Sequence, residues 1–495
     1  MACTTVLVGK EASYDGSTIV ARNEDSPSGI YNAKHFVVVL PKDQPRKYKS
    51  VLSHVEIELP DNPMRYTCTP NCDPAEGMWA TYGVNEKNVS MTATETITTN
   101  ERIMGADPLV VYQPAKDGKL EIAGGIGEED IVTITLPYIT SARHGVEFFG
   151  ELLRKYGTYE MNGIAFQDEN EIWWLETIGG HNWIARRVQD DEYVVMPNQL
   201  GIDFFDWEDA KGEKKNFMCS DTLYDIVQKY HLDLRMYDDE PFNPRHAFGS
   251  HSDSDHTYNT PRAWAILRYF NPNTFAWEGL DPSFTPESDD LPWSLVPEKK
   301  ITVEDVKWAL SNHYQGTPYD PYLKHGDLSA KGKYRPIGVN RTNILGLVQI
   351  RSNVPDKIKA LHYLAMGSNV YNALVPFYVN INHTPEYMGA AVNTATNAHF
   401  YWANRIIAAL ADPHFNENIV HVERYQNKVN YKVYNMINNF DEAYIKGEYK
   451  NEDEFFENAN KQISDFVQEQ TDDLLNKVLY TSSNLMRNGF SRSDA

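Results

Sequence analysis

Short apolar runs separated by polar turns form the hydrophobic pattern along most of this chain. The first run, Thr4–Val8, is β-branched and apolar, and residues 17–21 repeat that character after the turn Tyr14-Asp15-Gly16-Ser17. An Asp-Gly pair favours a turn because glycine adopts positive φ without steric cost. The pattern therefore predicts an N-terminal β-hairpin, with either 10–15 as its loop or a tight turn at Asp15-Gly16.

The same pattern continues downstream as further strands, interrupted by segments with helical periodicity. Residues 140–156 carry Val146, Phe149 and Leu153 at helix spacing and end at Gly157, a helix-stop residue. Strands are predicted where apolar positions alternate or run together. They are residues 35–40, 51–59, 78–82, 89–94, 164–167, 171–176, 182–188, 193–196, 344–349 and 360–366, of which the four between 164 and 196 predict a meander.

From Thr396 onward the pattern changes to long helical periodicity. The predicted helices are 400–411, 417–437 and 452–478, and the polar end of the chain predicts a loose tail. We therefore expect three parts: a core at 3–395, a helical C-terminal region at 396–480 packed on that core, and a tail at 481–495.

Composition narrows the class of protein without identifying its chemistry. The 495 residues include 41% hydrophobic and 12% aromatic side chains, which is typical of a packed globular protein. The formal net charge of −23 opposes nucleic-acid binding, because such binding depends on a basic surface. No apolar run reaches the roughly 18 residues of a membrane span, and no basic segment followed by an apolar core marks a secretory signal. We expect a cytoplasmic protein without nucleic-acid or membrane partners, and a homo-oligomer stays open.

Two motifs contain residue types found in ligand sites but lack the spacing that such sites require. His251 and His256 lie in the polar stretch 238–257, which predicts a solvated loop, and no H-E-x-x-H motif occurs. The Gly-Gly-Ile-Gly run at 124–127 lacks the Gly-Lys-Ser/Thr of a P-loop, and it predicts a turn into a helix that begins at Glu128. We expect neither a metal nor a cofactor.

Cys3 is the residue with the most distinctive chemistry. If Met1 and Ala2 are removed, Cys3 carries a thiol nucleophile and a free α-amine on the same Cα. The reference pKa of an α-amine lies near neutrality, so the amine can act as general base for its own thiol. A methionine aminopeptidase is expected to remove Met1, and autocatalytic attack by Cys3 on the Ala2 carbonyl would then release the amine. A cysteine near an N-terminus is more often an ordinary small apolar residue. A catalytic role for Cys3 therefore depends on which residues lie near it.

A charged segment, Arg22-Asn23-Glu24-Asp25, follows the second strand of the hairpin. With 10–15 as the loop, antiparallel pairing brings Arg22 or Asn23 opposite Cys3, whereas a tight turn at Asp15-Gly16 shifts the partner several residues on. In the first register Arg22 favours the thiolate, since nearby positive charge stabilises it, and Asp25 holds the α-amine. A structural ion pair at a strand end is the alternative.

Together these segments resemble the start of the dipeptidase A family, N-terminal-cysteine peptidases of the N-terminal nucleophile (Ntn) hydrolase superfamily that are related to the secernins. The likeness covers most of the chain, and its motifs come in the expected order. They are 3–9, 14–18, 21–26, Gly-Val-Asn-Glu-Lys at 83–87, Gly-Gly-Ile-Gly-Glu at 124–128, Glu-Ile-Trp-Trp-Leu-Glu at 171–176 and Tyr-Asn-Thr-Pro-Arg-Ala-Trp at 258–264. A more distant likeness is to choloylglycine hydrolases and penicillin V acylases. The resemblance implies an α+β fold, the Ntn-hydrolase αββα sandwich of two mainly antiparallel sheets flanked by helices, with a helical C-terminal extension.

The resemblance also implies roles for individual positions. Cys3 resembles the nucleophile, and Arg22 and Asp25 resemble the pair that orients its thiol and amine. Asn198 resembles an oxyanion-hole asparagine, and Arg262 resembles a second active-site arginine.

One position departs from the acylase pattern. A second oxyanion asparagine of the acylases falls on Glu95, and an ionised carboxylate cannot donate a hydrogen bond. Either a backbone N–H replaces that donor or the alignment shifts there. Because a dipeptide is charged at both ends, charge complementarity assigns its ammonium to Glu24 or Glu95 and its carboxylate to Arg262.

The resemblance therefore implies a dipeptidase, and the chemistry of Cys3 predicts that it forms a thioester on this cysteine. Two alternatives stay open. An amidase or acylase of the same superfamily would cleave a non-peptide amide, and a secernin-like protein would not be catalytic. The non-catalytic alternative is opposed by the joint presence of Cys3, Arg22, Asp25, Asn198 and Arg262.

Overall fold

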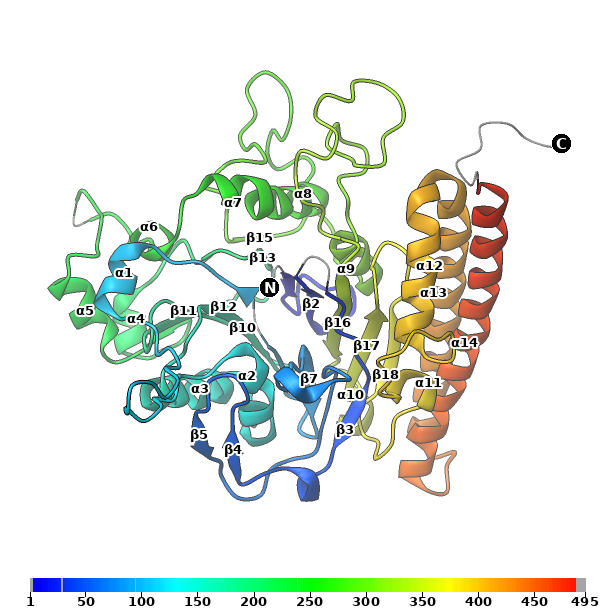
Figure 1. Ribbon diagram of the computed structural model, residues 1–495, viewed down its shortest axis with the longest axis horizontal. Coiled ribbons are helices and arrows are strands. Elements are labelled where there is room, and N and C mark those ends of the chain that lie inside the picture. Colours follow the sequence, from blue (N-terminus) through cyan, green and yellow to red (C-terminus); the bar gives the residue numbers. More distant parts are fainter. Residues whose placement is uncertain (1–2, 28–29, 94, 238, 487–495) are drawn as a thin grey trace.

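The computed structural model describes residues 3–27, 30–93, 95–237 and 239–486, apart from the side chain of Glu95 (Figure 1). Two β-sheets are stacked face to face at its centre, and helices cover the outer face of each sheet. The predicted α+β sandwich of two antiparallel sheets is confirmed.

The first sheet contains the N-terminal hairpin at its centre. Its order is β15-β13-β1-β2-β16-β17-β18, and each neighbouring pair is antiparallel. Its strands are β1 (Thr4–Val8), β2 (Thr18–Asp25), β13 (Tyr193–Met196), β15 (Ser294–Leu295), β16 (Thr342–Ile350), β17 (Ala360–Met366) and β18 (Val375–Tyr378). Because β1 and β2 are each paired on both sides, the start of the chain is held in the middle of the fold.

The second sheet has the order β14-β12-β11-β10-β8-β7-β6-β3, and β9 also pairs with β10. Its strands are β3 (Val37–Val39), β6 (Tyr66–Cys68), β7 (Tyr82–Asn85), β8 (Ser90–Thr92), β9 (Glu95–Thr96), β10 (Asn162–Gln167), β11 (Ile172–Thr177), β12 (Trp183–Val188) and β14 (Phe217–Cys219). A separate hairpin joins β4 (Lys47–Lys49) to β5 (Glu56–Glu58).

Side-chain alternation along the strands decides which residues face the space between the sheets. Leu7 and Val20 of the first sheet pack there against Trp174 of the second. Their neighbours Val6 and Ala21 point outward instead, into the core under α8 (Thr260–Phe270) and α9 (Val303–Leu310). On the far side, α2 (Glu128–Thr135) and α3 (Ala142–Tyr156) cover the second sheet.

The C-terminal helices pack beside the first sheet (Figure 1). They are α12 (Phe400–Ala411), α13 (Phe415–Ile445) and α14 (Glu452–Asn484). Their apolar faces share one core with β16, β17 and β18. The shorter helices are α1 (Glu101–Ala106), α4 (Trp207–Lys211), α5 (Leu223–Lys229), α6 (Pro244–Phe248), α7 (Asp253–Tyr258), α10 (Asp356–Lys359) and α11 (Glu386–Gly389).

The structure differs from the sequence predictions in several segments. The strand predicted at 78–82 overlaps β7 only at Tyr82, and of the strand predicted at 51–59 only β5 is formed. The predicted meander breaks at its fourth strand, because β13 leaves the second sheet and pairs with β1 in the first. The stretch predicted as a loop at 238–257 contains α6 and most of α7, whose first turns are capped by Asn243 and Ser252. Helix α14 continues to Asn484, past the predicted start of the tail at 481. Residues 487–495 of that predicted tail lie outside the described residues.

Candidate active site

Cys3 immediately precedes β1, and its side chain is buried. The register of the hairpin pairs Thr4 with Asn23 and Thr5 with Arg22. The hairpin therefore has the longer of the two predicted loops. The prediction that Arg22 or Asn23 lies directly opposite Cys3 is wrong, however, because the same register continued by one residue sets Glu24 there. Since side chains alternate along a strand, Cys3 and Arg22 share the face that points between the sheets.

The Arg22 guanidinium connects Cys3 to the second sheet and to α2. Its Nη2 donates hydrogen bonds to Cys3 Sγ at 3.0 Å and to Glu128 Oε1 at 2.6 Å, and its Nη1 donates to the main-chain oxygen of Thr81 at 3.1 Å. Arg22 is fully buried, and a buried charge without such partners would be costly. Positive charge in contact with sulfur stabilises a thiolate.

Glu128 is a residue of this site to which the sequence analysis assigned no role. It is the first residue of α2, where a helix start was predicted, and it is 1% exposed. Its bond to Arg22 links positions 106 residues apart, so no local pattern reveals it. The available signal was the glycine-rich turn before it. A Cβ on Gly127 would overlap the ring of Tyr159, which shows how closely this turn packs.

Glu24 shares the inner face with Arg22, but its carboxylate is already ion-paired. Lys34 Nζ lies 2.6 Å from Glu24 Oε1, and Thr81 Oγ1 donates to the other carboxylate oxygen. Burial lowers the pKa of Lys34, and the charge of Glu24 opposes that shift. The structure therefore differs from the expectation that Glu24 receives a substrate ammonium, because Lys34 occupies that position.

Asp25 points to the opposite face of β2. Thr342 Oγ1 donates to Asp25 Oδ1 at 2.5 Å, and the guanidinium of Arg335 pairs with Oδ2. Arg22 and Asp25 consequently flank the start of β1 from opposite faces of the sheet and do not form one ion pair. Arg335 is a further residue that sequence reasoning missed, because 310 positions separate it from Asp25.

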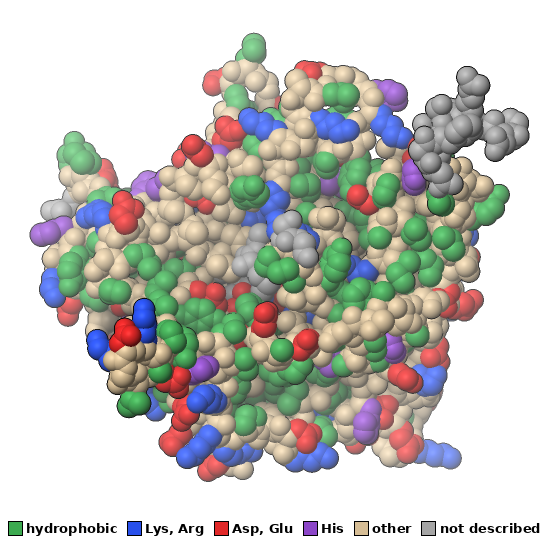
Figure 2. Space-filling model, viewed as in Figure 1, with side chains coloured by type: hydrophobic (Ala, Val, Ile, Leu, Met, Phe, Trp, Pro, Cys, Tyr) green, Lys and Arg blue, Asp and Glu red, His purple; other side chains and the backbone are tan. Residues whose placement is uncertain are grey.

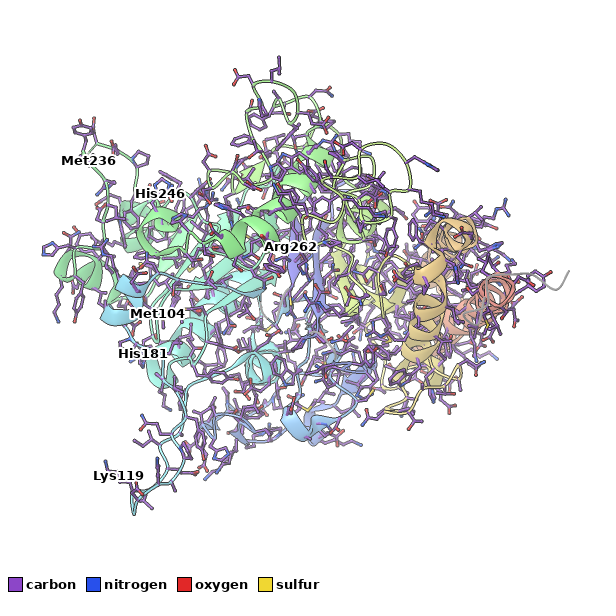
Figure 3. All side chains as sticks on the ribbon, turned by 45° about the horizontal axis from the view of Figure 1, so that its top comes forward. Met104, Lys119, His181, Met236, His246 and Arg262 are labelled. Carbon is purple, nitrogen blue, oxygen red and sulfur yellow. The ribbon has the colours of Figure 1, made fainter. Side chains whose placement is uncertain are left out.

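Arg262 and Asn198 meet on the outer face, where α8 lies beside the N-terminal hairpin (Figure 3). Arg262 Nη1 donates to the main-chain oxygen of Cys3 and to Thr4 Oγ1, the latter at 2.6 Å. Its Nη2 donates to Asn198 Oδ1 and Asn259 Oδ1, both at 2.7 Å. The structure thus brings Cys3, Asn198 and Arg262 together. Arg262 contacts the main chain of the cysteine, which differs from its expected role as a partner for a substrate carboxylate.

Glu95 lies in β9, where its main chain pairs with Gly163 of β10. Its side chain lies outside the described residues. The next residue, Thr96, accepts a hydrogen bond from Asn198 Nδ2 at 2.8 Å, so β9 approaches the same site.

The described residues contain neither a group of side chains arranged for a metal ion nor a helix suited to a membrane span. No group of three or more His, Cys, Asp or Glu side chains there is arranged to hold a metal ion. His256 Nε2 instead lies 2.9 Å from Asp289 Oδ1. Across the same residues, no helix is both long and apolar enough to span a bilayer. On the face shown in Figure 2, Lys and Arg side chains are interspersed with Asp and Glu.

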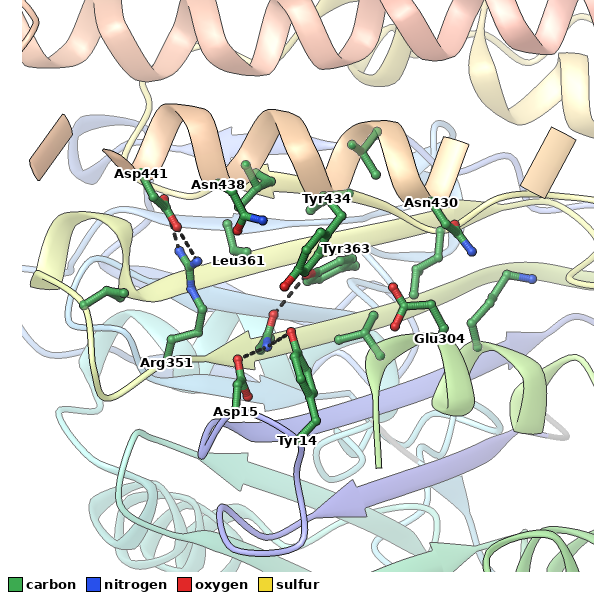
Figure 4. Close-up of a pocket in the computed structure, with 18 of the residues that line it drawn as sticks. Tyr14, Asp15, Glu304, Arg351, Leu361, Tyr363, Asn430, Tyr434, Asn438 and Asp441 are labelled. Carbon is green, nitrogen blue, oxygen red and sulfur yellow. Dashed lines mark hydrogen bonds and ion pairs between the residues drawn. The ribbon is translucent and has the colours of Figure 1, made fainter. Parts of the chain in front are cut away.

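A separate cavity of about 230 Å³ lies between the first sheet and α13 (Figure 4). Its lining includes Tyr14, Glu304 and Tyr434, together with the ion pair in which Arg351 Nη1 lies 2.5 Å from Asp441 Oδ2. Its lining includes none of the predicted site residues. The candidate active site is therefore the cluster around Cys3.

Comparison with known proteins adds independent information. Residues 2–428 match the profile of Peptidase family C69. The chain is 51% identical to a "Dipeptidase" of Bifidobacterium longum and 49% identical to a "Probable dipeptidase A" of Streptococcus pyogenes serotype M3, in each case over 100% of both chains. It is 46% identical to "Dipeptidase A" of Lactobacillus helveticus over 83% of this chain and 82% of that protein.

Proposed function

The chain belongs to peptidase family C69, and on that basis we propose that it is a cysteine-type dipeptidase with Cys3 as its N-terminal nucleophile. The observation that carries the proposal is the 3.0 Å hydrogen bond from Arg22 Nη2 to Cys3 Sγ. A buried thiol next to a guanidinium is a suitable nucleophile, because the thiolate is the reactive form and positive charge stabilises it.

We propose that removal of Met1 and Ala2 prepares the enzyme. The α-amine of Cys3 then accepts the thiol proton, directly or through a water. The thiolate attacks the carbonyl carbon of the dipeptide and forms a C–S bond. Collapse of the tetrahedral intermediate breaks the C–N bond, and the amine returns its proton to the leaving amino acid. Water then attacks the thioester, which breaks the C–S bond, releases the first amino acid and restores the thiol.

Asn198 is proposed as a donor to the oxyanion. Its Oδ1 accepts from Arg262 Nη2 and its Nδ2 donates to the main-chain oxygen of Thr96, so both contacts fix the orientation of the amide beside Cys3. A donor aimed at a developing oxyanion is typically worth about 3–4 kcal/mol. Arg262 is proposed as a positioning residue, since it holds both Asn198 and the main-chain oxygen of Cys3.

Asp25 is proposed to orient the α-amine of the mature cysteine. Its support is the family resemblance and its position at the end of β2, next to the residue that the register sets opposite Cys3. Glu95 stays a proposed contact for substrate, through the part of β9 that approaches Asn198.

Mass spectrometry of the intact purified protein tests the nucleophile. We expect a chain that begins at Cys3, and we expect one alkylation by iodoacetamide to abolish dipeptide hydrolysis. Cys3→Ala should lower the turnover number by at least about a thousandfold, since the covalent step is lost. A chain that keeps Ala2 and is fully active would contradict the α-amine base.

Substrate profiling separates the proposed activity from its alternatives. A dipeptidase should hydrolyse free dipeptides in preference to acylated amino acids. The reverse preference would identify an amidase or acylase of the same superfamily.

A further inference from the structure

Four carboxyl groups gather where α2 begins, directly behind Arg22. Glu128, Glu129 and Asp130 are consecutive in the first turn of α2, and each is at most 1% exposed. Glu160 joins them, because the Glu128 N–H donates to Glu160 Oε1 at 2.7 Å. So many carboxylates in a buried space require compensation by donors or cations.

Two of the four carboxylates are satisfied by neutral donors. Asp130 Oδ1 accepts from the Tyr48 hydroxyl at 2.6 Å, and Asp130 Oδ2 accepts from the Gly127 N–H at 3.2 Å. Glu129 Oε1 accepts from Ser50 Oγ at 3.0 Å, and Glu129 Oε2 accepts from the Tyr159 hydroxyl at 2.7 Å. These two side chains therefore serve the local structure.

Glu128 is less completely paired. Glu128 Oε1 receives Arg22, and that contact is the cluster's one ion pair in the described part of the chain. Glu128 Oε2 is buried and has no hydrogen-bond partner among the described residues. Because buried polar atoms normally have a hydrogen-bond partner, Glu128 Oε2 is suited to accept a hydrogen bond from a bound group.

The electrostatics of the cluster also favour an added cation. Burial, and then the charge of Glu128, raises the pKa of Glu160 to about 8. Burial, and then the charge of Glu129, raises the pKa of Asp130 to about 7. A cation placed among these groups would offset their mutual repulsion and stabilise the ionised forms.

The cluster lies close to the sulfur. Arg22 Nη2 bonds both Cys3 Sγ and Glu128 Oε1, so the carboxylate is within about 6 Å of the sulfur when the two bonds are laid end to end. In a dipeptide, the α-ammonium nitrogen is one carbon away from the scissile carbonyl, a distance of about 2.5 Å from standard bond lengths. A carbonyl held at Sγ therefore brings its ammonium within reach of Glu128.

We propose that Glu128 and Glu160 form the binding site for the α-ammonium of the substrate's first residue. This inference rests on the proposed function, and it names the side chains that give that function its substrate class. Glu128 Oε2 accepts one N–H of the ammonium and Glu160 accepts a second. Substrates with a free amine next to the scissile carbonyl are selected, and amino-blocked substrates bring no cation to Glu160 and no ammonium N–H to Glu128 Oε2.

The test is the substitution Glu160→Gln in the mature enzyme. Glutamine keeps an acceptor for the Glu128 N–H and removes the charge. We expect the KM for a dipeptide to rise about 10- to 100-fold, the range for a lost hydrogen bond to a charged group. The Ki of the matching des-amino analogue, used as a competitive inhibitor, should change by less than about twofold. An unchanged KM for the dipeptide, or an equal loss for both compounds, would overturn the ammonium site.

Asp130→Asn is the matched control. It removes the same charge from the same cluster, but at a side chain whose oxygens already have donors. We expect a rise in KM below about threefold, since only the longer-range field changes. An effect as large as that of Glu160→Gln would overturn the proposed direct contact. If the glutamine variant does not fold, Glu160→Asp keeps the charge with a shorter reach and should raise the KM for the dipeptide alone.

The outcomes also separate this inference from the function on which it rests. Wild-type protein without Cys3-dependent dipeptide hydrolysis would overturn the proposed function. A Cys3-dependent dipeptidase that binds the des-amino analogue as tightly as the dipeptide would overturn only the ammonium site.

Discussion

Two arginines contact the same cysteine from opposite faces of the first sheet, and each reaches different atoms. On the inner face, Arg22 reaches the sulfur of Cys3 and is backed by the carboxylate of Glu128. On the outer face, Arg262 reaches the main-chain oxygen of Cys3 and is backed by the amide oxygens of Asn198 and Asn259. Both arginines are fully buried, so burial does not distinguish them. From these contacts we propose that the inner face sets the reactivity of the thiol and the outer face sets its position.

The largest effect is expected from the inner face. Arg22→Gln removes the cation at the sulfur, and we expect kcat/KM for a dipeptide to fall about 100- to 1000-fold, the range for one lost electrostatic contact at a reacting atom. The rate of Cys3 alkylation by iodoacetamide at neutral pH should fall with it, because less thiolate is present. Stopped assays of both rates on the mature enzyme provide the measurement.

A paired variant keeps that test interpretable. Arg22→Gln alone leaves Glu128 buried without its partner, which typically costs about 3–5 kcal/mol. Arg22→Gln combined with Glu128→Gln removes both charges and should recover much of the lost stability. If the folded double variant is alkylated as fast as the wild type, Arg22 does not control the reactivity of the thiol.

A smaller and different effect is expected from the outer face. Arg262→Lys keeps the charge, but an ammonium lacks the planar fork that reaches the Cys3 oxygen and Asn198 together. We expect kcat/KM to fall about 10- to 100-fold through misplacement of the nucleophile and the oxyanion donor. The alkylation rate should stay within about threefold of wild type, because the contact with sulfur remains. A parallel loss of alkylation would erase the distinction between the two faces.

How much of this arrangement the sequence predicts depends on how local each contact is. The bounds of β1, β13, β17 and α12 match the predicted ones, because apolar patterning over a few residues specifies an element. The sheet that β13 joins could not be predicted. Its pairing with β1 joins residues that are far apart in sequence, such as Thr5 and Met196.

The site residues follow the same rule. Cys3, Arg22, Asn198 and Arg262 stand in motifs with a family resemblance, and the structure brings them together. The partners that decide their roles are distant in sequence. Lys34 forms an ion pair with Glu24, and Glu128 was predicted only as the start of a helix. Alternation along β2 does predict that Arg22 and Asp25 point to opposite faces, a step that the charge pattern alone does not supply.

The smallest expected effect is on the pH dependence of the melting temperature. It tests the inner face alone, because the buried carboxyl cluster lies on that side. The folded pKa of Glu160 is raised to about 8 by burial and by Glu128, above the usual value for glutamate. A group with a raised folded pKa binds more protons in the folded state, so its stabilising contribution is present at low pH and is lost as the pH rises through about 8.

The melting temperature of the wild type should therefore fall between about pH 5 and pH 8, and that of Glu160→Gln should fall less, by an amount equivalent to about 1–2 kcal/mol. As a control, Glu213→Gln changes an exposed glutamate, and the melting temperature of this variant should change with pH in parallel with that of the wild type. If the gap between wild type and Glu160→Gln is the same at both pH values, proton binding at Glu160 does not contribute to stability.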